Sequence, residues 1–133
     1  MRKAAEIDFA RRTGFLEKDL ISLWLEERRR RRGGREYGIE GGKLSYDIFL
    51  EMFLTSFRLA FILRDERINY PYRELGDDDI ERYWKENRDL FTRYNGDSFE
   101  KDEVENIIAK RIREEEYEKN VEEILLLLSS SPR

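Results

Sequence analysis

The sequence contains neither cysteine nor histidine. Without these residues the chain cannot form a thiol nucleophile, a Ser-His-Asp triad, or a zinc or iron–sulfur site built from Cys and His. Carboxylates, lysines, tyrosines and hydroxyls remain for acid–base chemistry. We therefore predict no catalytic set, no cofactor and no metal site, and we expect that the protein is not an enzyme.

Long apolar runs are also missing. No segment approaches the ~20 apolar residues of a membrane span. The N-terminal residues MRKAAEIDFARR carry charges throughout, whereas a signal peptide needs an apolar stretch there. The sequence predicts neither a transmembrane segment nor a signal peptide. A leader removed upstream would leave the same sequence, so the compartment stays open.

Charge of one sign is not in large excess. The chain has 26 basic and 30 acidic residues, a net charge of −4, and this balance argues against a general nucleic-acid binder. Aromatic residues make up 13% of the 133 residues, too many for a disordered chain. We predict a single helical domain over residues 1–133, with residues 128–133 as a frayed tail.

The apolar residues repeat at the spacing of helices, and no segment reads convincingly as a strand. The fold class predicted is all-α, with about five helices: residues 3–12, 16–32, 46–66, a short helix opened by Gly76, and a long C-terminal helix of about 99–128. Gly14 is predicted to end the first helix in a left-handed conformation. The glycine-rich stretch 33–44 and Asn95-Gly96 are predicted to be a loop and a turn.

The helix expected over residues 46–66 is apolar around most of its circumference. One stripe contains Phe49, Phe53, Phe57 and Phe61, and a second contains Ile48, Met52, Leu59 and Ile62. A helix of this kind is buried by neighbours on several sides. We therefore expect it to be the centre of the core.

The long C-terminal helix has an apolar stripe that changes direction. Its apolar positions keep three- and four-residue spacing except for a five-residue step from Ile112 to Tyr117. This step moves the stripe around the helix axis, so we expect the helix to pack against several other helices in turn.

Three polar clusters are candidate sites. Asp77–Asp79 fit an N-cap and an acidic first turn better than a cation site, because consecutive helix residues point about 100° apart. Glu26 and Glu27 with Glu36 or Glu40 could form a carboxylate pair for hydrolysis, but charged surface helices produce such pairs constantly. Arg28–Arg32 with Arg35 fit a solvated helix end better than a phosphate or membrane contact.

Aromatic residues are the main candidates for binding a peptide or a protein partner. Most of them must lie in the core of a domain of this size, but helical proteins that bind polypeptides keep part of such a surface exposed. The candidate positions are Trp24, Phe53, Phe57, Phe61, Tyr83 and Trp84.

The segment DDDIERYWKENRDLF resembles a motif of the SurA/PrsA-type parvulin foldases. The positions that match are Asp78, Asp79, Ile80, Tyr83, Trp84, Glu86, Asn87 and Phe91. The last long helix resembles the one that follows the parvulin domain in these proteins, with Val104, Ile108, Ile112 and Tyr117 at the apolar positions. In that family a catalytic domain separates the two segments, whereas only Thr92 to Ser98 separate them here.

The resemblance implies a chaperone module, similar to the N-terminal module of SurA, without the isomerase. Its partner would be unfolded or extended polypeptide, and a removed leader would place it outside the cytoplasm. The alternative is a structural or regulatory helical protein that acts as a homodimer through the C-terminal helix or as a subunit of a complex. The run Leu125–Leu128 suits such helix exchange.

Overall fold

The computed structural model describes residues 1–33, 44–91 and 101–130, and these ranges contain helices and no strand. This confirms the predicted all-α class with five α-helices and a long C-terminal helix. Of the loop predicted at 33–44, residues 34–43 lie outside the described residues and Gly33 is the last residue of α2; the Asn95-Gly96 turn also lies outside the described residues. The elements are α1 Arg2–Arg12, α2 Leu20–Gly33, α3 Tyr46–Ile62, α4 Asp77–Glu86, the 3-10 helix η3 Arg88–Phe91, and α5 Lys101–Ser130.

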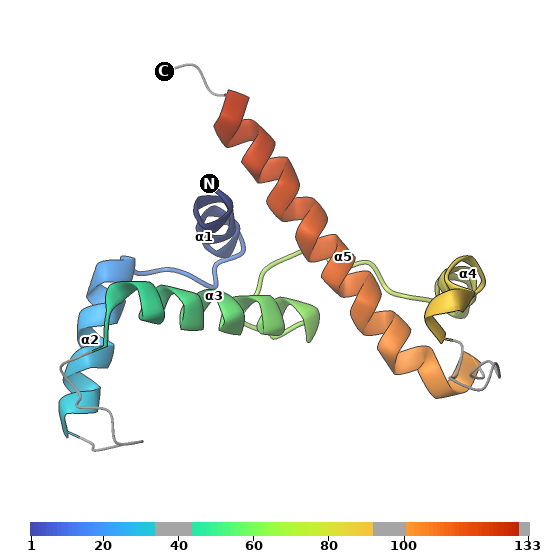
Figure 1. Ribbon diagram of the computed structural model, residues 1–133, viewed down its shortest axis with the longest axis horizontal. Helices are drawn as coiled ribbons and strands as arrows, with labels where there is room; N and C mark the ends of the chain where they lie inside the picture. Colours follow the sequence, from blue (N-terminus) through green and yellow to red (C-terminus); the bar gives the residue numbers. More distant parts are fainter. Residues whose placement is uncertain (34–43, 92–100, 131–133) are drawn as a thin grey trace.

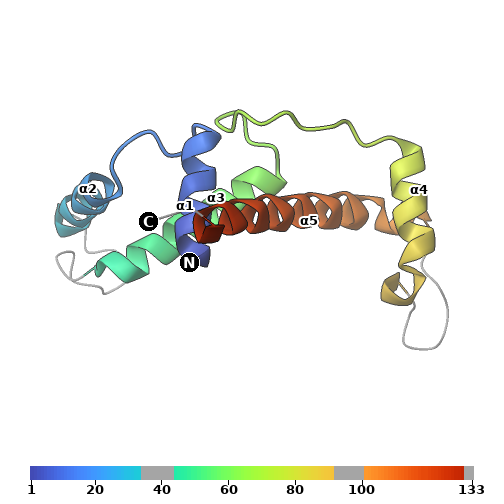
Figure 2. The same ribbon diagram turned by 90° about the horizontal axis from the view of Figure 1, so that it is seen from above.

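The helices form an open, elongated arrangement along α5 (Figure 1). Helices α1 and α3 pack against α5 and against each other, whereas α4 packs on the N-terminal part of α5, away from α1 and α3 (Figure 2). Helix α2 packs on α3 at the opposite end of the molecule. The 30 residues of α5 span about 45 Å at ~1.5 Å per residue, which is why one helix can serve both ends.

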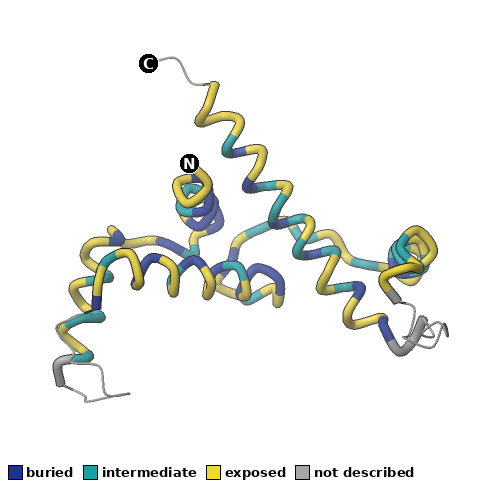
Figure 3. Tube along the Cα trace, in the orientation of Figure 1, coloured by how far each residue is buried: buried dark blue, intermediate teal, exposed yellow. Residues whose placement is uncertain are grey.

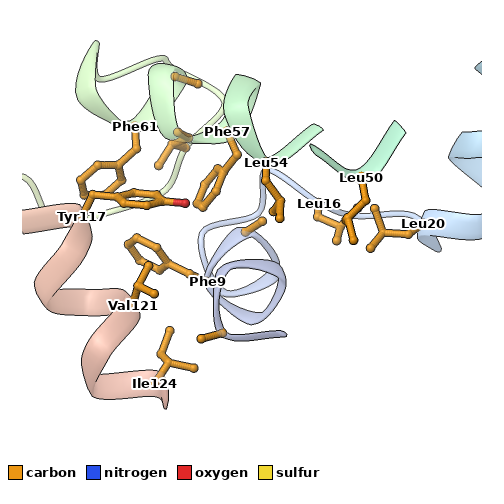
Figure 4. Packing of buried hydrophobic residues seen from close by; sticks show 14 of the residues in the cluster. Phe9, Leu16, Leu20, Leu50, Leu54, Phe57, Phe61, Tyr117, Val121 and Ile124 are labelled. Atoms are coloured by element: carbon orange, nitrogen blue, oxygen red, sulfur yellow. The ribbon is translucent and has the colours of Figure 1, made fainter. Parts of the chain in front are cut away.

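The main core is a cluster of aromatic rings where α1, α3 and α5 meet (Figure 4). Phe57, Phe61 and Tyr117 are fully buried and Phe9 is 3% exposed. The ring of Phe9 lies 5.4 Å from Phe57, 5.2 Å from Phe61 and 5.7 Å from Tyr117, between ring centroids. Edge-on and tilted contacts of this kind add to the apolar burial. They fix α1 in the angle between α3 and α5.

A second, smaller core joins α4 to the N-terminal part of α5. Its buried members are Ile80, Val104 and Ile108, with Tyr83, Trp84, Ala109 and Ile112 packed around them. Tyr117 belongs to the main core instead. The five-residue step from Ile112 to Tyr117 therefore marks the point where α5 exchanges one set of neighbours for another. This confirms the prediction that α5 packs against several helices.

Two predicted helix boundaries are wrong. Helix α2 begins at Leu20 rather than at residue 16, because Asp19 caps it by accepting a hydrogen bond from the Ser22 amide at 3.2 Å. Helix α3 ends at Ile62 rather than at residue 66, because Arg64 adopts a left-handed backbone with φ of 54°. The left-handed turn at Gly14 is confirmed, with φ of 79°.

Helix α3 is central, but its neighbours cover only part of its surface. The side of α3 that faces α1 is buried, and the opposite side is exposed (Figure 3). Of the second apolar stripe, Ile62 is buried, whereas Ile48, Met52 and Leu59 are 55%, 43% and 56% exposed. The prediction that neighbours bury this helix on several sides is therefore wrong for the second stripe.

Candidate functional site

The six aromatic residues predicted as candidates lie in three different parts of the structure. Trp24 is on α2, and Phe53, Phe57 and Phe61 are on α3, whereas Tyr83 and Trp84 are on α4. Helices α2 and α4 lie at opposite ends of the molecule (Figure 1). The structure therefore does not bring the six side chains together in one aromatic cleft.

Trp24 and Phe53 lie near each other on the α2–α3 side. Trp24 is half-buried, and its Nε1 donates a hydrogen bond to the Leu44 carbonyl at 2.8 Å. The Arg28 guanidinium lies 5.0 Å from the centroid of the Trp24 ring. These contacts tie α2 to the residues that precede α3. They give Trp24 a structural role.

Phe53 lines an apolar groove of about 410 Å³ between α2 and α3. The Arg67 guanidinium lies 5.0 Å from the Phe15 ring centroid at one wall. The Glu27 carboxyl also lines the groove, so its polar groups carry both signs of charge. The lining residues are Phe15, Leu23, Glu27, Phe49, Met52, Phe53, Ser56 and Arg67.

Phe57 and Phe61 have no exposed surface. Both rings contact Tyr117 at 5.7 Å between centroids, and both belong to the main core (Figure 4). Neither ring is presented to a binding partner in this conformation.

Tyr83 and Trp84 belong to the smaller core. The Tyr83 hydroxyl donates to Glu115 Oε1 at 3.0 Å, and burial is the main cause that raises the pKa of Tyr83. Trp84 Nε1 is buried and has no hydrogen-bond partner among the described residues. The Arg88 guanidinium lies 4.6 Å from the Trp84 ring centroid. Both aromatic side chains thus fasten α4 to α5.

A charged groove of about 400 Å³ follows one side of α5, and the sequence interpretation did not single it out. Glu114, Glu118 and Glu122 recur at four-residue spacing, so they share one helix face. That spacing is the signal in the sequence that identifies the groove. We call it the acidic groove; it is lined by Arg58, Tyr83, Arg111, Glu114, Glu115, Glu118, Lys119 and Glu122.

The carboxylates of the acidic groove form ion pairs. Glu118 receives two hydrogen bonds from Arg2, at 2.8 and 2.9 Å, and its carboxylate raises the pKa of Arg2. Arg58 approaches Glu114 at 4.0 Å and Glu118 at 3.9 Å. The side chains of Glu114 and Glu118 are 43% and 40% exposed, so this is a solvated network on the protein surface.

One carboxylate lies inside the main core. Glu6 is 9% exposed, and its Oε2 accepts a hydrogen bond from the buried Tyr117 hydroxyl at 2.6 Å. Arg2 Nε lies 3.3 Å from the other oxygen of Glu6. Burial is the main cause that raises the pKa of Tyr117. Because both oxygens have partners, this pair stabilises the contact between α1 and α5.

The polar clusters named from the sequence are engaged in local contacts. Asp79 Oδ1 accepts a hydrogen bond from Arg73 at 2.7 Å, and Oδ2 accepts one from the Gly76 amide at 3.0 Å. These hydrogen bonds, the one from Arg73 first, lower the pKa of Asp79. Gly76, and not an aspartate, is the N-cap of α4. Glu27 accepts hydrogen bonds from the arginine run of α2, and these lower the pKa of Glu27. Glu36, Glu40 and Arg35 lie outside the described residues.

The described ranges contain no group of three or more Asp and Glu residues placed to hold a metal ion. None of their helices is long and apolar enough to span a membrane.

Comparison with solved structures gives two similar structures, both of one enzyme. No family model matches the chain, and no curated protein matches it. The crystal structure of native GH136 lacto-N-biosidase from Eubacterium ramulus is 26% identical over 95% of this chain, with a TM-score of 0.56. The selenomethionine derivative of the same enzyme is 22% identical over 95% of this chain, with a TM-score of 0.50. In both comparisons the chain spans 19% of the length of the enzyme.

This finding contradicts the resemblance to SurA/PrsA-type foldases, and with it the chaperone function that the resemblance implied. The structural likeness over 95% of this chain is to part of a glycoside hydrolase. The residues that suggested a foldase are those of any capped amphipathic helix. Ile80, Tyr83 and Trp84 face α5 because a helix of this length needs an apolar face, so such a motif does not distinguish one helical family from another.

Proposed function

We propose that this chain is a non-catalytic helical module that associates with the catalytic part of a glycoside hydrolase. The observation that carries the proposal is the likeness of 95% of this chain to 19% of a lacto-N-biosidase chain. A module that corresponds to such a small part of an enzyme works together with the remaining part. The catalytic part would be either the same polypeptide or a separate subunit.

The open architecture supports association with a larger partner. Helix α4 packs on α5 with its own small core, away from α1 and α3, so the described helices do not close into one compact bundle. Leu126 and Leu127 at the end of α5 are 70% and 56% exposed and lie on different sides of the helix. A helix end that is apolar on several sides is normally covered by other protein.

The chemistry of the acidic groove supports a non-catalytic role. Glycoside hydrolases use two carboxyl groups on either side of the scissile bond. Here Glu118 is bound by the Arg2 guanidinium, and the Arg58 guanidinium lies 4.0 Å from Glu114. Both carboxylates are therefore engaged in ion pairs within the chain.

The proposal is tested with tagged chain and an extract of its source organism. The purified chain alone should not hydrolyse a chromogenic lacto-N-bioside. The fraction captured by the tagged chain should hydrolyse that substrate or another chromogenic glycoside, and a tagged unrelated helical protein should capture no such activity. Hydrolysis by the chain alone would refute the non-catalytic role, and a captured fraction without glycosidase activity would refute association with a separate catalytic subunit.

A further inference from the structure

Helix α3 and its C-cap residue, Leu63, carry a line of exposed apolar side chains on the face turned away from α1 and α5. Ile48, Met52, Leu59 and Leu63 are 55%, 43%, 56% and 57% exposed. Their spacing of four, seven and four residues keeps them within about 60° of one another around the helix and spreads them over about 22 Å. We call these four residues the outer stripe.

The spacing of the outer stripe is the same when it is read from either end of α3. A two-fold rotation through the midpoint between Thr55 and Ser56 reverses the helix direction. This rotation exchanges Ile48 with Leu63 and Met52 with Leu59. The two residues at the midpoint are small and exposed, so they permit close approach of another helix there. A surface that matches its own reverse is what a two-fold symmetric contact requires.

We propose that the outer stripe binds a second copy of this chain, with the two α3 helices antiparallel. Ile48 then contacts Leu63 of the other copy, and Met52 contacts Leu59 of the other copy. Apolar side chains at this spacing interlock between antiparallel helices as in a coiled coil. This dimer is distinct from one formed through the C-terminal helix, because its contact lies on α3. The buried face of α5 packs against α1, α3 and α4 of its own chain.

The charges beside the outer stripe are also self-complementary. Glu51 and Arg58 lie on the same flank of α3, seven residues apart. In the antiparallel pair the same flanks of both copies meet, and Glu51 of one copy lies about 3 Å along the axis from Arg58 of the other. Each chain therefore contributes one carboxylate and one guanidinium to two equivalent ion pairs.

Both charged groups can reach a second copy. The Glu51 side chain is 69% exposed, and its ion pair with Lys3 is 3.5 Å long. The Arg58 side chain is 42% exposed, and its approaches to Glu114 and Glu118 are 4.0 and 3.9 Å long. Long, exposed ion pairs of this kind cost little to exchange for others, although Arg58 must also give up its position 5.9 Å from the Tyr117 ring centroid.

The remaining fold leaves the stripe accessible. The buried residues of α3 face α1, and the exposed side points away from them (Figure 3). Helix α3 is also held by the main core, so it offers a rigid surface. This inference does not depend on the proposed function, since the exposed leucines at the end of α5 remain available to a catalytic partner.

Sedimentation equilibrium of the purified chain tests the proposal. We expect a reversible dimer in the micromolar range and a loss of dimer in Leu59→Glu, because the introduced carboxylate would be buried next to Met52 of the other copy. Leu126→Glu is the matched control: it places the same charge at an exposed leucine on α5 and should leave the dimer unchanged. Circular dichroism should show both variants to be folded.

Charge reversal tests the antiparallel register. Glu51→Arg or Arg58→Glu alone should weaken the dimer several-fold, because each creates two pairs of like charges. The double variant Glu51→Arg/Arg58→Glu should restore the affinity of the wild type. Because the chain has no cysteine, Ser56→Cys can also be cross-linked with a short bismaleimide. Asp47→Cys, on another side of the same helix, should cross-link much less.

Three outcomes would overturn the proposal. The first is a chain that stays monomeric at high micromolar concentration. The second is a dimer that Leu126→Glu disrupts and Leu59→Glu does not. The third is a monomer whose Leu59→Glu variant loses captured glycosidase activity, which would assign the outer stripe to the catalytic partner and leave the proposed function intact.

Discussion

The hydrogen bond between Tyr117 and Glu6 is the contact whose removal should most clearly change stability without changing shape. The Tyr117 hydroxyl donates to Glu6 Oε2 at 2.6 Å inside the main core. Tyr117→Phe keeps the ring and its contacts with Phe9, Phe57 and Phe61, so it creates no large cavity. What it removes is a hydrogen-bond donor to a carboxylate that water reaches poorly.

The expected loss of unfolding free energy follows from these surroundings. A hydrogen bond to a charged group contributes about 1.5–3 kcal/mol, and removal of the Tyr117 hydroxyl leaves the buried Glu6 oxygen without its donor. Arg2 still contacts the second oxygen of Glu6, so we expect a loss of about 2 kcal/mol. With a urea m-value of about 2 kcal/mol/M, the midpoint of unfolding should fall by about 1 M.

Urea unfolding followed by circular dichroism measures this change, and the m-value should stay constant. Tyr72→Phe is the control, because the Tyr72 hydroxyl donates to a neutral acceptor, the Phe61 carbonyl, at 2.7 Å. Its loss should be about 1 kcal/mol. A double-mutant cycle with Glu6→Gln should show coupling of more than about 1 kcal/mol between positions 6 and 117. Coupling near zero, or equal losses in the two Phe variants, would refute the reasoning.

Three further predictions concern stability. Burial is the main cause that raises the pKa values of Tyr70, Tyr72 and Tyr117 above the unfolded value near 10. The contribution of these tyrosines to the free energy of unfolding is therefore complete below about pH 10 and is lost as the pH rises further. Urea unfolding between pH 8 and 11 should show a falling free energy of unfolding. Gly14→Ala should cost about 1 kcal/mol, because φ is 79° there, although no atom lies within 4 Å of the added Cβ; an unchanged urea midpoint would contradict this. Ile80→Ala should speed amide hydrogen exchange in α4 while α1 and α3 keep their protection, since α4 has its own small core.

The sequence predicts the helices well because their signals are local. Ser45, a residue type that favours helix starts, caps α3 by accepting a hydrogen bond from the Ile48 amide at 3.2 Å. Gly14 has the left-handed backbone that ends the first helix. The errors also have local causes. The apolar pattern extends back to Leu16, although Asp19 caps α2, and nothing in the apolar pattern near Arg64 indicates that α3 stops at Ile62.

The candidate site is harder to predict because it depends on which helix faces are left uncovered. The pattern of α3 shows two apolar stripes, but only the positions of α1 and α5 decide that one is buried and the other is exposed. Residue type alone groups the aromatic side chains, whereas the fold places Trp24 on α2 and Trp84 on α4, and these helices lie at opposite ends of the molecule (Figure 1). The acidic groove could have been found from the four-residue spacing of Glu114, Glu118 and Glu122.

The two cores are linked by polar contacts at the point where the apolar stripe of α5 changes direction. Arg113 is 4% exposed, and it lies between Ile112 of the smaller core and Tyr117 of the main core. Its guanidinium donates to the Arg73 carbonyl at 2.7 Å and to Glu116 at 3.0 Å, and it lies 5.2 Å from the Tyr72 ring centroid.

These contacts fasten the segment between α3 and α4 along α5. Asn120 donates to the Tyr70 hydroxyl at 3.0 Å, which adds a second attachment one helical turn beyond Glu116. Two attachments on a rigid helix fix the direction of the segment, and with it the distance of α4 from the main core. The elongated shape is therefore built into the chain by Arg113 and Asn120, and a partner would meet α3 and α4 as two surfaces held apart by α5.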